Sequence, residues 1–241
     1  MFEEVIRSKA RLHATSLDVS TLKYVVKNKS TSTMMMSEDK EILSSFTKRQ
    51  DHHPVRELFG GAMRLRVPER FRDVSDFRPV PDSQEVFTCL DTEETLIVEI
   101  LEYQDDVSDE KAAKFFFEEL AEQNDASSFS ILSSESLPES SRPLLPKNMS
   151  VLLLKGTQDA SKFREASKNK IAVYQTVVRL RNVRADLLIT LTVPIRIDLS
   201  SSSAKVVSKS VLKHGIDLKD SESLFRGMVK SFGVFDWSLF V

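Results

Sequence analysis

Two glutamates stand at the end of the most apolar segment of the chain. Glu99 interrupts the run from Leu96 to Leu101, and Glu102 follows its last residue. Burying an unpaired carboxylate is costly, so Glu99 must reach water, a base or a ligand. Residues three apart on a regular strand face opposite sides, so these two carboxylates form one site only if the strand bends or ends between them.

Three kinds of chemistry are open to this pair. The glutamates could be the general acid and base of an enzyme, acidic contacts for a partner's Lys or Arg, or members of a salt bridge at a sheet edge. The residues that would support catalysis are scarce. Three of the four histidines, His13, His52 and His53, precede the folded body, and no glycine-rich phosphate loop occurs. The sequence therefore argues against catalysis, leaves open both a partner contact and a salt bridge at the sheet edge, and predicts neither a metal nor a cofactor.

Charge is distributed unevenly along the chain. The net charge is −2, but the segment from Asp91 to Asp125 contains thirteen acidic residues against only Lys111 and Lys114. Such a segment argues for a basic partner and against nucleic acid, whose phosphates it would repel, but charge alone favours the simpler interpretation of a solvated acidic surface. No apolar run approaches the roughly 20 residues of a membrane span, so no membrane contact is expected. We interpret the single cysteine, Cys89, as a small buried residue.

The chain divides into two parts by composition. Residues 1–55 are rich in Ser, Thr and Lys and have no sustained hydrophobic period, which predicts a disordered N-terminal extension. The acidic residues Glu3 and Glu4 argue against a transit peptide in this part. Residues 56–241 are predicted to form one folded domain.

Hydrophobic periodicity predicts the elements of this domain. Strands are expected at 63–67, 84–90, 96–101, 129–132, 151–155, 171–181 and 185–193, with the last two forming a hairpin and Pro194 ending the pattern. A helix should follow the N-cap Ser108, and others are expected at 204–213 and 221–232, the latter capped by Asp220 or Ser221. We expect 133–150 to be a loop. These elements predict an α+β domain with a six-to-seven-stranded antiparallel sheet flanked by helices on both faces.

Four blocks of sequence resemble a known family. They are Leu58–Ala62, Asp73–Phe87, Leu96–Glu102 and the closing segment Asp236–Phe240, and they occur in this order. Together they resemble the Ran guanine-nucleotide release factor family, also called the Mog-one family, over Leu58 to Val241. The resemblance implies a six-stranded antiparallel sheet with helices on both faces, similar to PsbP-type photosystem proteins. Residues 1–55 have no counterpart in this family, and Arg64 and Arg66 depart from it.

The resemblance also implies a function. Members of the family bind the small GTPase Ran and promote release of its guanine nucleotide, which supports nuclear transport, so we expect a non-enzymatic, monomeric protein of the nucleus and cytoplasm. The family's paired acidic residues for Ran binding fall on Glu99 and Glu102. The other motif block supplies four secondary candidates for the same surface, Asp73, Asp76, Asp82 and Glu85. The alternative is a PsbP-like photosystem-associated plastid protein.

Overall fold

The computed structural model describes residues 53–161 and 167–240. The predicted disordered extension, 1–55, lies outside this range except at 53–55, where the first strand begins at Val55. Within the described range, no helix is both long and apolar enough to cross a membrane.

The described residues form two antiparallel sheets and three α-helices. The strands are β1 (Val55–Leu58), β2 (Met63–Arg66), β3 (Phe71–Asp73), β4 (Gln84–Cys89), β5 (Thr95–Glu102), β6 (Ser128–Ser136), β7 (Ser150–Ser161), β8 (Lys168–Leu180), β9 (Ala185–Arg196) and β10 (Gly233–Val234). The helices are α4 (Asp109–Gln123), α5 (Lys209–His214) and α6 (Leu218–Ser231). Short 3-10 turns are η1 (Phe59–Gly61), η2 (Glu139–Ser141), η4 (Arg181–Val183), η5 (Ser202–Lys205) and η6 (Trp237–Phe240).

The large sheet confirms the predicted α+β class. It has seven strands in the order β3-β4-β5-β9-β8-β7-β6, and every neighbouring pair is antiparallel. The predicted hairpin is the β8–β9 pair, connected through η4. A second sheet of three strands, β1-β2-β10, was not predicted, because its strands are short and its last strand comes from the opposite end of the domain.

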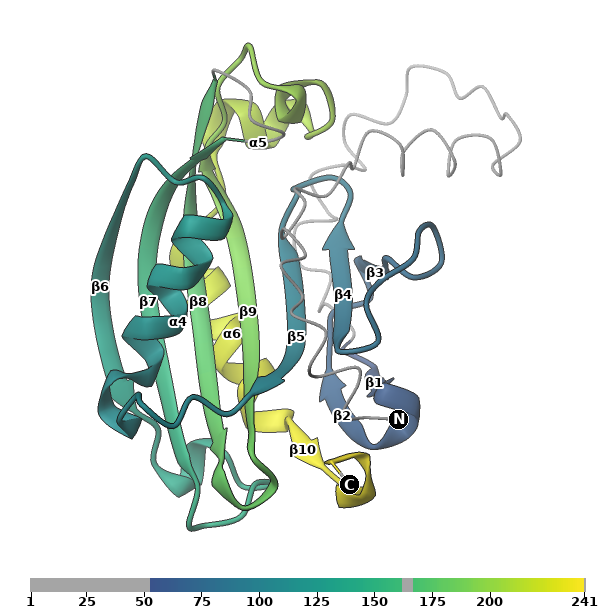
Figure 1. The fold of residues 1–241 in the computed structure, drawn as a ribbon. Coiled ribbons are helices and arrows are strands. Elements are labelled where there is room, and N and C mark those ends of the chain that lie inside the picture. The colour runs from purple at the N-terminus through teal and green to yellow at the C-terminus, as the bar shows by residue number, and fades with distance from the viewer. Residues whose placement is uncertain (1–52, 162–166, 241) are drawn as a thin grey trace.

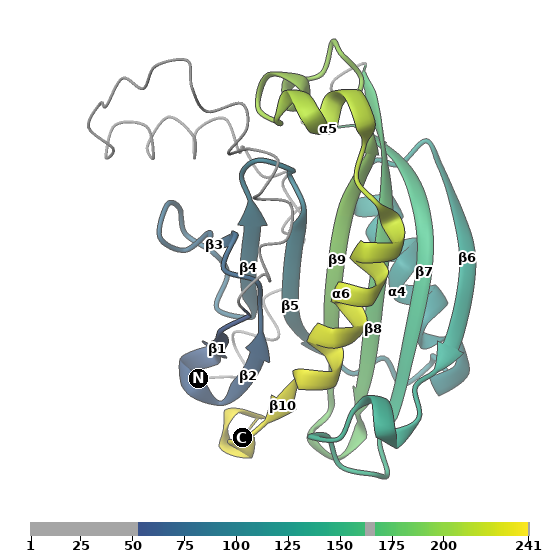
Figure 2. The ribbon, with the colours of Figure 1, turned by 180° about the vertical axis from the view of Figure 1, so that it is seen from behind.

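Helices cover both faces of the large sheet (Figures 1 and 2). On one face, Phe116 and Phe117 of α4 pack with Leu154 of β7 in a small apolar cluster. On the other face, α6 and the small sheet share a larger cluster, to which they contribute Phe225 and Met63. The central strands β8 and β9 are buried over most of their length, because both of their faces are covered.

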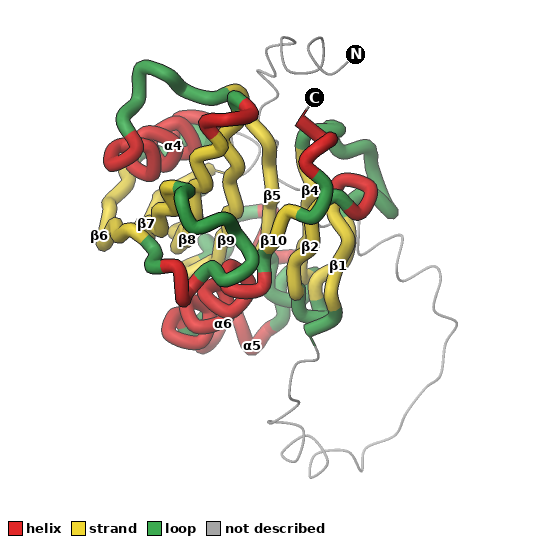
Figure 3. Tube along the Cα trace, turned by 90° about the horizontal axis from the view of Figure 1, so that it is seen from below, coloured by secondary structure: helices red, strands yellow, loops and turns green. Residues whose placement is uncertain are grey.

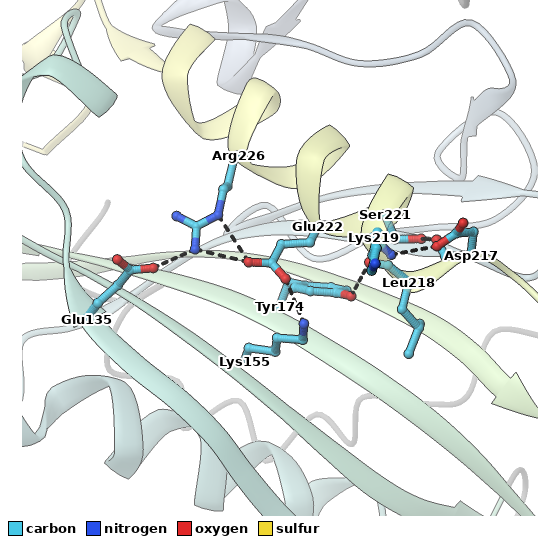
Figure 4. A network of polar contacts seen from close by, with 9 residues as sticks. All are labelled: Glu135, Lys155, Tyr174, Asp217, Leu218, Lys219, Ser221, Glu222 and Arg226. Carbon is cyan, nitrogen blue, oxygen red and sulfur yellow. Dashed lines mark hydrogen bonds and ion pairs between the residues drawn. The ribbon is translucent and has the colours of Figure 1, made fainter.

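A polar network also fixes α6 against the sheet (Figure 4). Lys155 Nζ on β7 donates a 2.6 Å hydrogen bond to Glu222 Oε2, and this contact lowers the pKa of Glu222. Arg226 Nη2, one turn further along α6, donates to Glu222 Oε1 at 3.1 Å and to Glu135 Oε1 on β6 at 2.5 Å. The helix is therefore tied to two strands by charge as well as by apolar burial.

Two predicted strand ends were wrong. Pro194 does not end its strand, since β9 continues to Arg196 and Pro194 pairs with Ile171 beside a register shift in the β8–β9 pairing. A proline has no N–H to donate and is tolerated at such an irregularity. The predicted loop 133–150 begins too early, because β6 continues to Ser136 at the edge of the sheet. All nine of its residues are exposed, so no alternation in hydrophobicity marks it.

The two C-terminal helices also differ from the prediction. The expected helix at 204–213 is divided into η5 and α5, and α5 begins after Ser208, whose side chain accepts a hydrogen bond from Val211 N–H. Helix α6 begins at Leu218, three residues before the predicted start. Its N-cap is Asp217, whose Oδ1 accepts from Lys219 N–H at 2.8 Å. A carboxylate at this position suits the positive end of the helix dipole.

Candidate functional site

The two glutamates of the apolar run lie at one end of β5 but on opposite faces of it. Glu99 pairs with Gln84 of β4 and with Leu188 of β9, and Glu102 pairs with Ala185. The register with β9 runs through all eight pairs without a shift, and the strand ends at Glu102 rather than between the two residues. Side chains alternate along such a strand, so the structure does not bring the two carboxylates onto one face.

Glu99 faces the α4 side of the sheet and is partly buried. Gln84 Nε2, directly across the strand pair, donates a 2.7 Å hydrogen bond to Glu99 Oε2. Burial raises the pKa of Glu99, and the hydrogen bond from Gln84 opposes that rise. Its only side-chain partner in the described part of the chain is this neutral amide, so no cation of the molecule neutralises it.

Glu102 is exposed on the opposite face. Arg184 precedes Ala185, the strand partner of Glu102, and lies at the left-handed end of the η4 turn, where its guanidinium forms a two-point ion pair with Asp105. The pKa of Arg184 is raised chiefly by Asp105, with a smaller contribution from the charge of Glu102. Over residues 53–161 and 167–240, Glu102 itself forms no ion pair, and its carboxylate is open to solvent.

A buried arginine supports the segment that follows Glu102. Arg179 Nε lies 2.7 Å from Asp186 Oδ1, and both side chains are at most 1% exposed. The same guanidinium donates to the carbonyls of Gln104 at 2.8 Å and Val107 at 2.9 Å, and it stacks 4.2 Å from the centre of the Tyr103 ring. This buried ion pair was not predicted from the sequence. The signal was a lone arginine inside the long apolar run of β8, which required a buried acceptor.

The secondary candidates divide into two pairs. Asp73 and Glu85 lie on the same face of the β3–β4 pair, opposite to Glu99, and both are engaged within the fold. Asp73 Oδ1 accepts from Ser75 N–H at 2.8 Å, and Glu85 Oε1 accepts from Phe59 N–H at 2.5 Å. Burial raises the pKa of Glu85, the Phe59 N–H opposes that rise, and the charge of Asp73 adds to it.

Asp76 and Asp82 lie in the connection between β3 and β4 and are exposed. Neither carboxylate has a polar partner among the residues that the structure describes. They are free to contact another molecule, whereas Asp73 and Glu85 are held by backbone N–H groups. In the same described range, no group of three His, Cys, Asp or Glu side chains is arranged to hold a metal ion.

The fold and the site define an α+β protein that presents uncompensated carboxylates at one end of a mostly buried strand. Residues 56–194 match the family described as Ran-interacting Mog1 protein. The chain is 37% identical to the probable Ran guanine nucleotide release factor of Dictyostelium discoideum, over 77% of this chain and 95% of that protein. It is 39% identical to the Ran guanine nucleotide release factor of Danio rerio, over 62% and 82% of the two chains.

A solved structure agrees with these sequence matches. The Ran-binding protein Mog1p of Saccharomyces cerevisiae superimposes with a TM-score of 0.57 at 25% identity, covering 78% of this chain and 98% of that one. The chain belongs to the Ran-interacting Mog1 protein family. The family expected from the four sequence blocks is therefore confirmed.

Proposed function

We propose that this chain binds the small GTPase Ran and promotes release of its guanine nucleotide, in support of nuclear protein import. The relatives in Dictyostelium discoideum and Danio rerio are named as Ran guanine nucleotide release factors, and that in Schizosaccharomyces pombe as a nuclear import protein. The chain acts by binding, as a regulator of a GTPase, and catalyses no reaction of its own. These matches favour Ran over the alternative of a PsbP-like plastid protein.

One observation carries the assignment of the site. Glu99 and Glu102 end β5 with no cation of the described chain paired to either carboxylate, although arginines lie close by. The arginines near β5 form ion pairs with other acidic residues: Arg184 with Asp105, and Arg179 with Asp186. The two glutamates thus remain available for lysines or arginines of the GTPase.

The opposite orientation of the two glutamates gives them different roles. Glu102 is exposed and meets a basic group at the surface, where charge mainly accelerates association. Glu99 is partly buried beside Gln84, so its contact with a basic group of the GTPase is desolvated. Such a contact mainly slows dissociation. The exposed Asp76 and Asp82 extend the acidic surface, and Asp73 and Glu85 add negative charge on the face of the sheet that carries Glu102.

Nucleotide release follows from thermodynamic linkage. If the chain binds Ran more tightly when its nucleotide pocket is empty or disturbed, then its binding lowers nucleotide affinity by the same factor. The carboxylates achieve this by pairing with basic groups of the GTPase that otherwise bind the phosphates of the nucleotide.

The protein is monomeric on its own and works in the nucleus and cytoplasm.

The test is a nucleotide-release assay with purified proteins. Ran carrying a fluorescent guanine nucleotide is mixed with the full chain and an excess of unlabelled nucleotide, and the loss of fluorescence is followed. We expect the wild-type chain to accelerate release, and Glu99→Ala to weaken the complex by about 2–5 kcal/mol, as for a truncated buried charge contact. Glu119→Gln on α4, an exposed acidic residue, is the control and should release at the wild-type rate. The function is wrong if the wild-type chain neither binds Ran nor accelerates release.

A further inference from the structure

A cleft of about 440 Å³ lies where two of the motif blocks meet, between η1 and η6. Phe235 N–H and Asp236 N–H both donate to the carbonyl of Ala62, at 2.8 and 3.1 Å, and β10 pairs with β2. The end of the chain is thereby attached beside the turn that follows β1, and Figures 2 and 3 show the C-terminal turn next to the small sheet. We call this space the η1–η6 cleft.

One wall of the cleft is a backbone turn of unusual conformation. Phe59, Gly60 and Gly61 have φ angles of 50°, 66° and 95°. The left-handed region costs a glycine little, but it is rarely occupied by a bulky residue such as phenylalanine. The conformation is held by Glu85, which accepts the Phe59 N–H. The wall of the cleft is therefore connected directly to one of the carboxylates of the acidic motif block.

The charges that line the cleft do not balance. Glu57 and Asp236 contribute two carboxylates, and Arg64 contributes one guanidinium. Arg64 Nη2 lies 3.4 Å from Glu57 Oε1, and Arg64 Cζ lies 5.1 Å from the centre of the Phe235 ring. Asp236 accepts from Ser238 N–H at 2.9 Å, and its hydrogen bonds to Ser238 lower its pKa, so it is ionised at neutral pH. Counted over the described residues that line it, the cleft carries one net negative charge.

We propose that the η1–η6 cleft receives a lysine or arginine side chain of Ran, as a second contact beside Glu99 and Glu102. The net charge selects a cation, and the side chains of Phe59 and Leu239 in the lining suit the aliphatic stem of such a residue. Each carboxylate retains acceptor capacity beyond its present bonds. Glu85 of the acidic block accepts a hydrogen bond from Phe59, which lines the cleft. This inference rests on the proposed function, because it concerns the same partner.

The test compares two charge-neutralising pairs in the Ran binding and release assays. The double variant Glu57→Gln/Asp236→Asn removes both acids of the cleft. The matched control Glu118→Gln/Glu119→Gln removes two acids from α4, on the other face of the large sheet. We expect the cleft variant to bind Ran about fivefold to tenfold more weakly and with a smaller dependence on salt. The α4 variant should change binding by less than about twofold.

The variant Arg64→Gln tests whether the cleft binds a positively or a negatively charged group. Removing the cation of the cleft should strengthen binding of a basic side chain, by about twofold. Weaker binding of this variant would show that the cleft takes an anionic group and would overturn the proposal. Unchanged binding by Glu57→Gln/Asp236→Asn would overturn it as well.

Two further observations separate the possible failures. In spectra of ¹⁵N-labelled chain, addition of unlabelled Ran should shift the amides of Gly60 and Gly61, and Glu57→Gln/Asp236→Asn should reduce these shifts while its own spectrum stays that of a folded protein. If Glu99→Ala no longer accelerates nucleotide release from Ran while the cleft variant still does, the cleft proposal fails and the proposed function stands. If the wild-type chain does not bind Ran, both fail.

Discussion

Gln84 and Glu99 face each other across β4 and β5 and are joined by a 2.7 Å hydrogen bond from the amide to the carboxylate. The amide solvates the carboxylate without neutralising it. The pKa of Glu99 remains raised because burial outweighs this hydrogen bond. Within the described part of the chain no cation pairs with Glu99, which leaves its carboxylate able to pair with a basic group of another protein.

Neutralising Glu99 should separate stability from function. A carboxyl whose folded pKa is raised contributes stability that is present below the unfolded pKa, about 4.3, and is lost as pH rises through the folded pKa. Glu99→Gln keeps a hydrogen-bond acceptor for Gln84 and removes this loss. In urea unfolding over a series of pH values, the free energy of unfolding of the variant should rise relative to that of the wild type as pH increases. The affinity of the variant for Ran should be lower than that of the wild type. A stability difference that is constant with pH would contradict the raised pKa.

Glu102 should act on the rate of association. Its carboxylate is exposed and unpaired in the described structure, so Glu102→Gln should leave the free energy of unfolding within about 0.5 kcal/mol of the wild type. Stopped-flow mixing with Ran should show a lower association rate and a weaker dependence of that rate on salt, with the dissociation rate changed less. An effect confined to dissociation would argue against the surface role assigned to this residue.

The buried ion pair behind the site should be essential for stability. Arg179→Met leaves Asp186 buried without its cation and frees two backbone carbonyls, so we expect a loss of about 3–5 kcal/mol, measured by chemical denaturation. Arg179→Met/Asp186→Leu removes both charges and should lose less than the single variant. A double variant as unstable as the single one would show that the carbonyl contacts, rather than the ion pair, dominate.

Gly156 should be required for α4 to approach the sheet. A Cβ at this position would lie 2.4 Å from Phe117 Cζ and 2.7 Å from the carbonyl oxygen of Ser130, so Gly156→Ala should cost about 1–3 kcal/mol in a thermal or urea unfolding experiment. Gly227→Ala on α6 is the matched control. A Cβ there meets no atom of the described residues within 4 Å, so this substitution should stabilise by about 0.5–1 kcal/mol. Equal effects of the two substitutions would contradict the packing described for α4.

The contact between Lys155 and Glu222 should make the free energy of unfolding depend on pH in the acid range. Lys155 lowers the folded pKa of Glu222, so its contribution is present above the unfolded pKa, about 4.3, and is lost as pH falls through the folded value. Glu222→Gln should therefore be less stable than the wild type at pH 7, and the two proteins should converge toward pH 3. Unfolding measured at these two pH values tests the sign. Divergence at low pH would refute it.

Local pattern was sufficient for the parts of the fold whose burial is periodic. Helix α4 follows from its apolar stripe, and the β8–β9 hairpin follows from two apolar runs separated by a short turn. The edge strand β6 was only partly visible, because a strand exposed along its whole length has no burial period. The two-residue strand β10 was invisible, because it exists only through its pairing with β2.

The candidate site divides in the same way. The sequence by itself determined that Glu99 and Glu102 end an apolar strand and that residues three apart face opposite sides, because side-chain alternation is a local property of the backbone. Only the tertiary structure decided that Gln84 stands across from Glu99, that Arg179 meets Asp186, and that the two ends of the domain enclose a cleft. Strand register and long-range packing set these contacts, and they depend on the energy of the whole core rather than on any one segment.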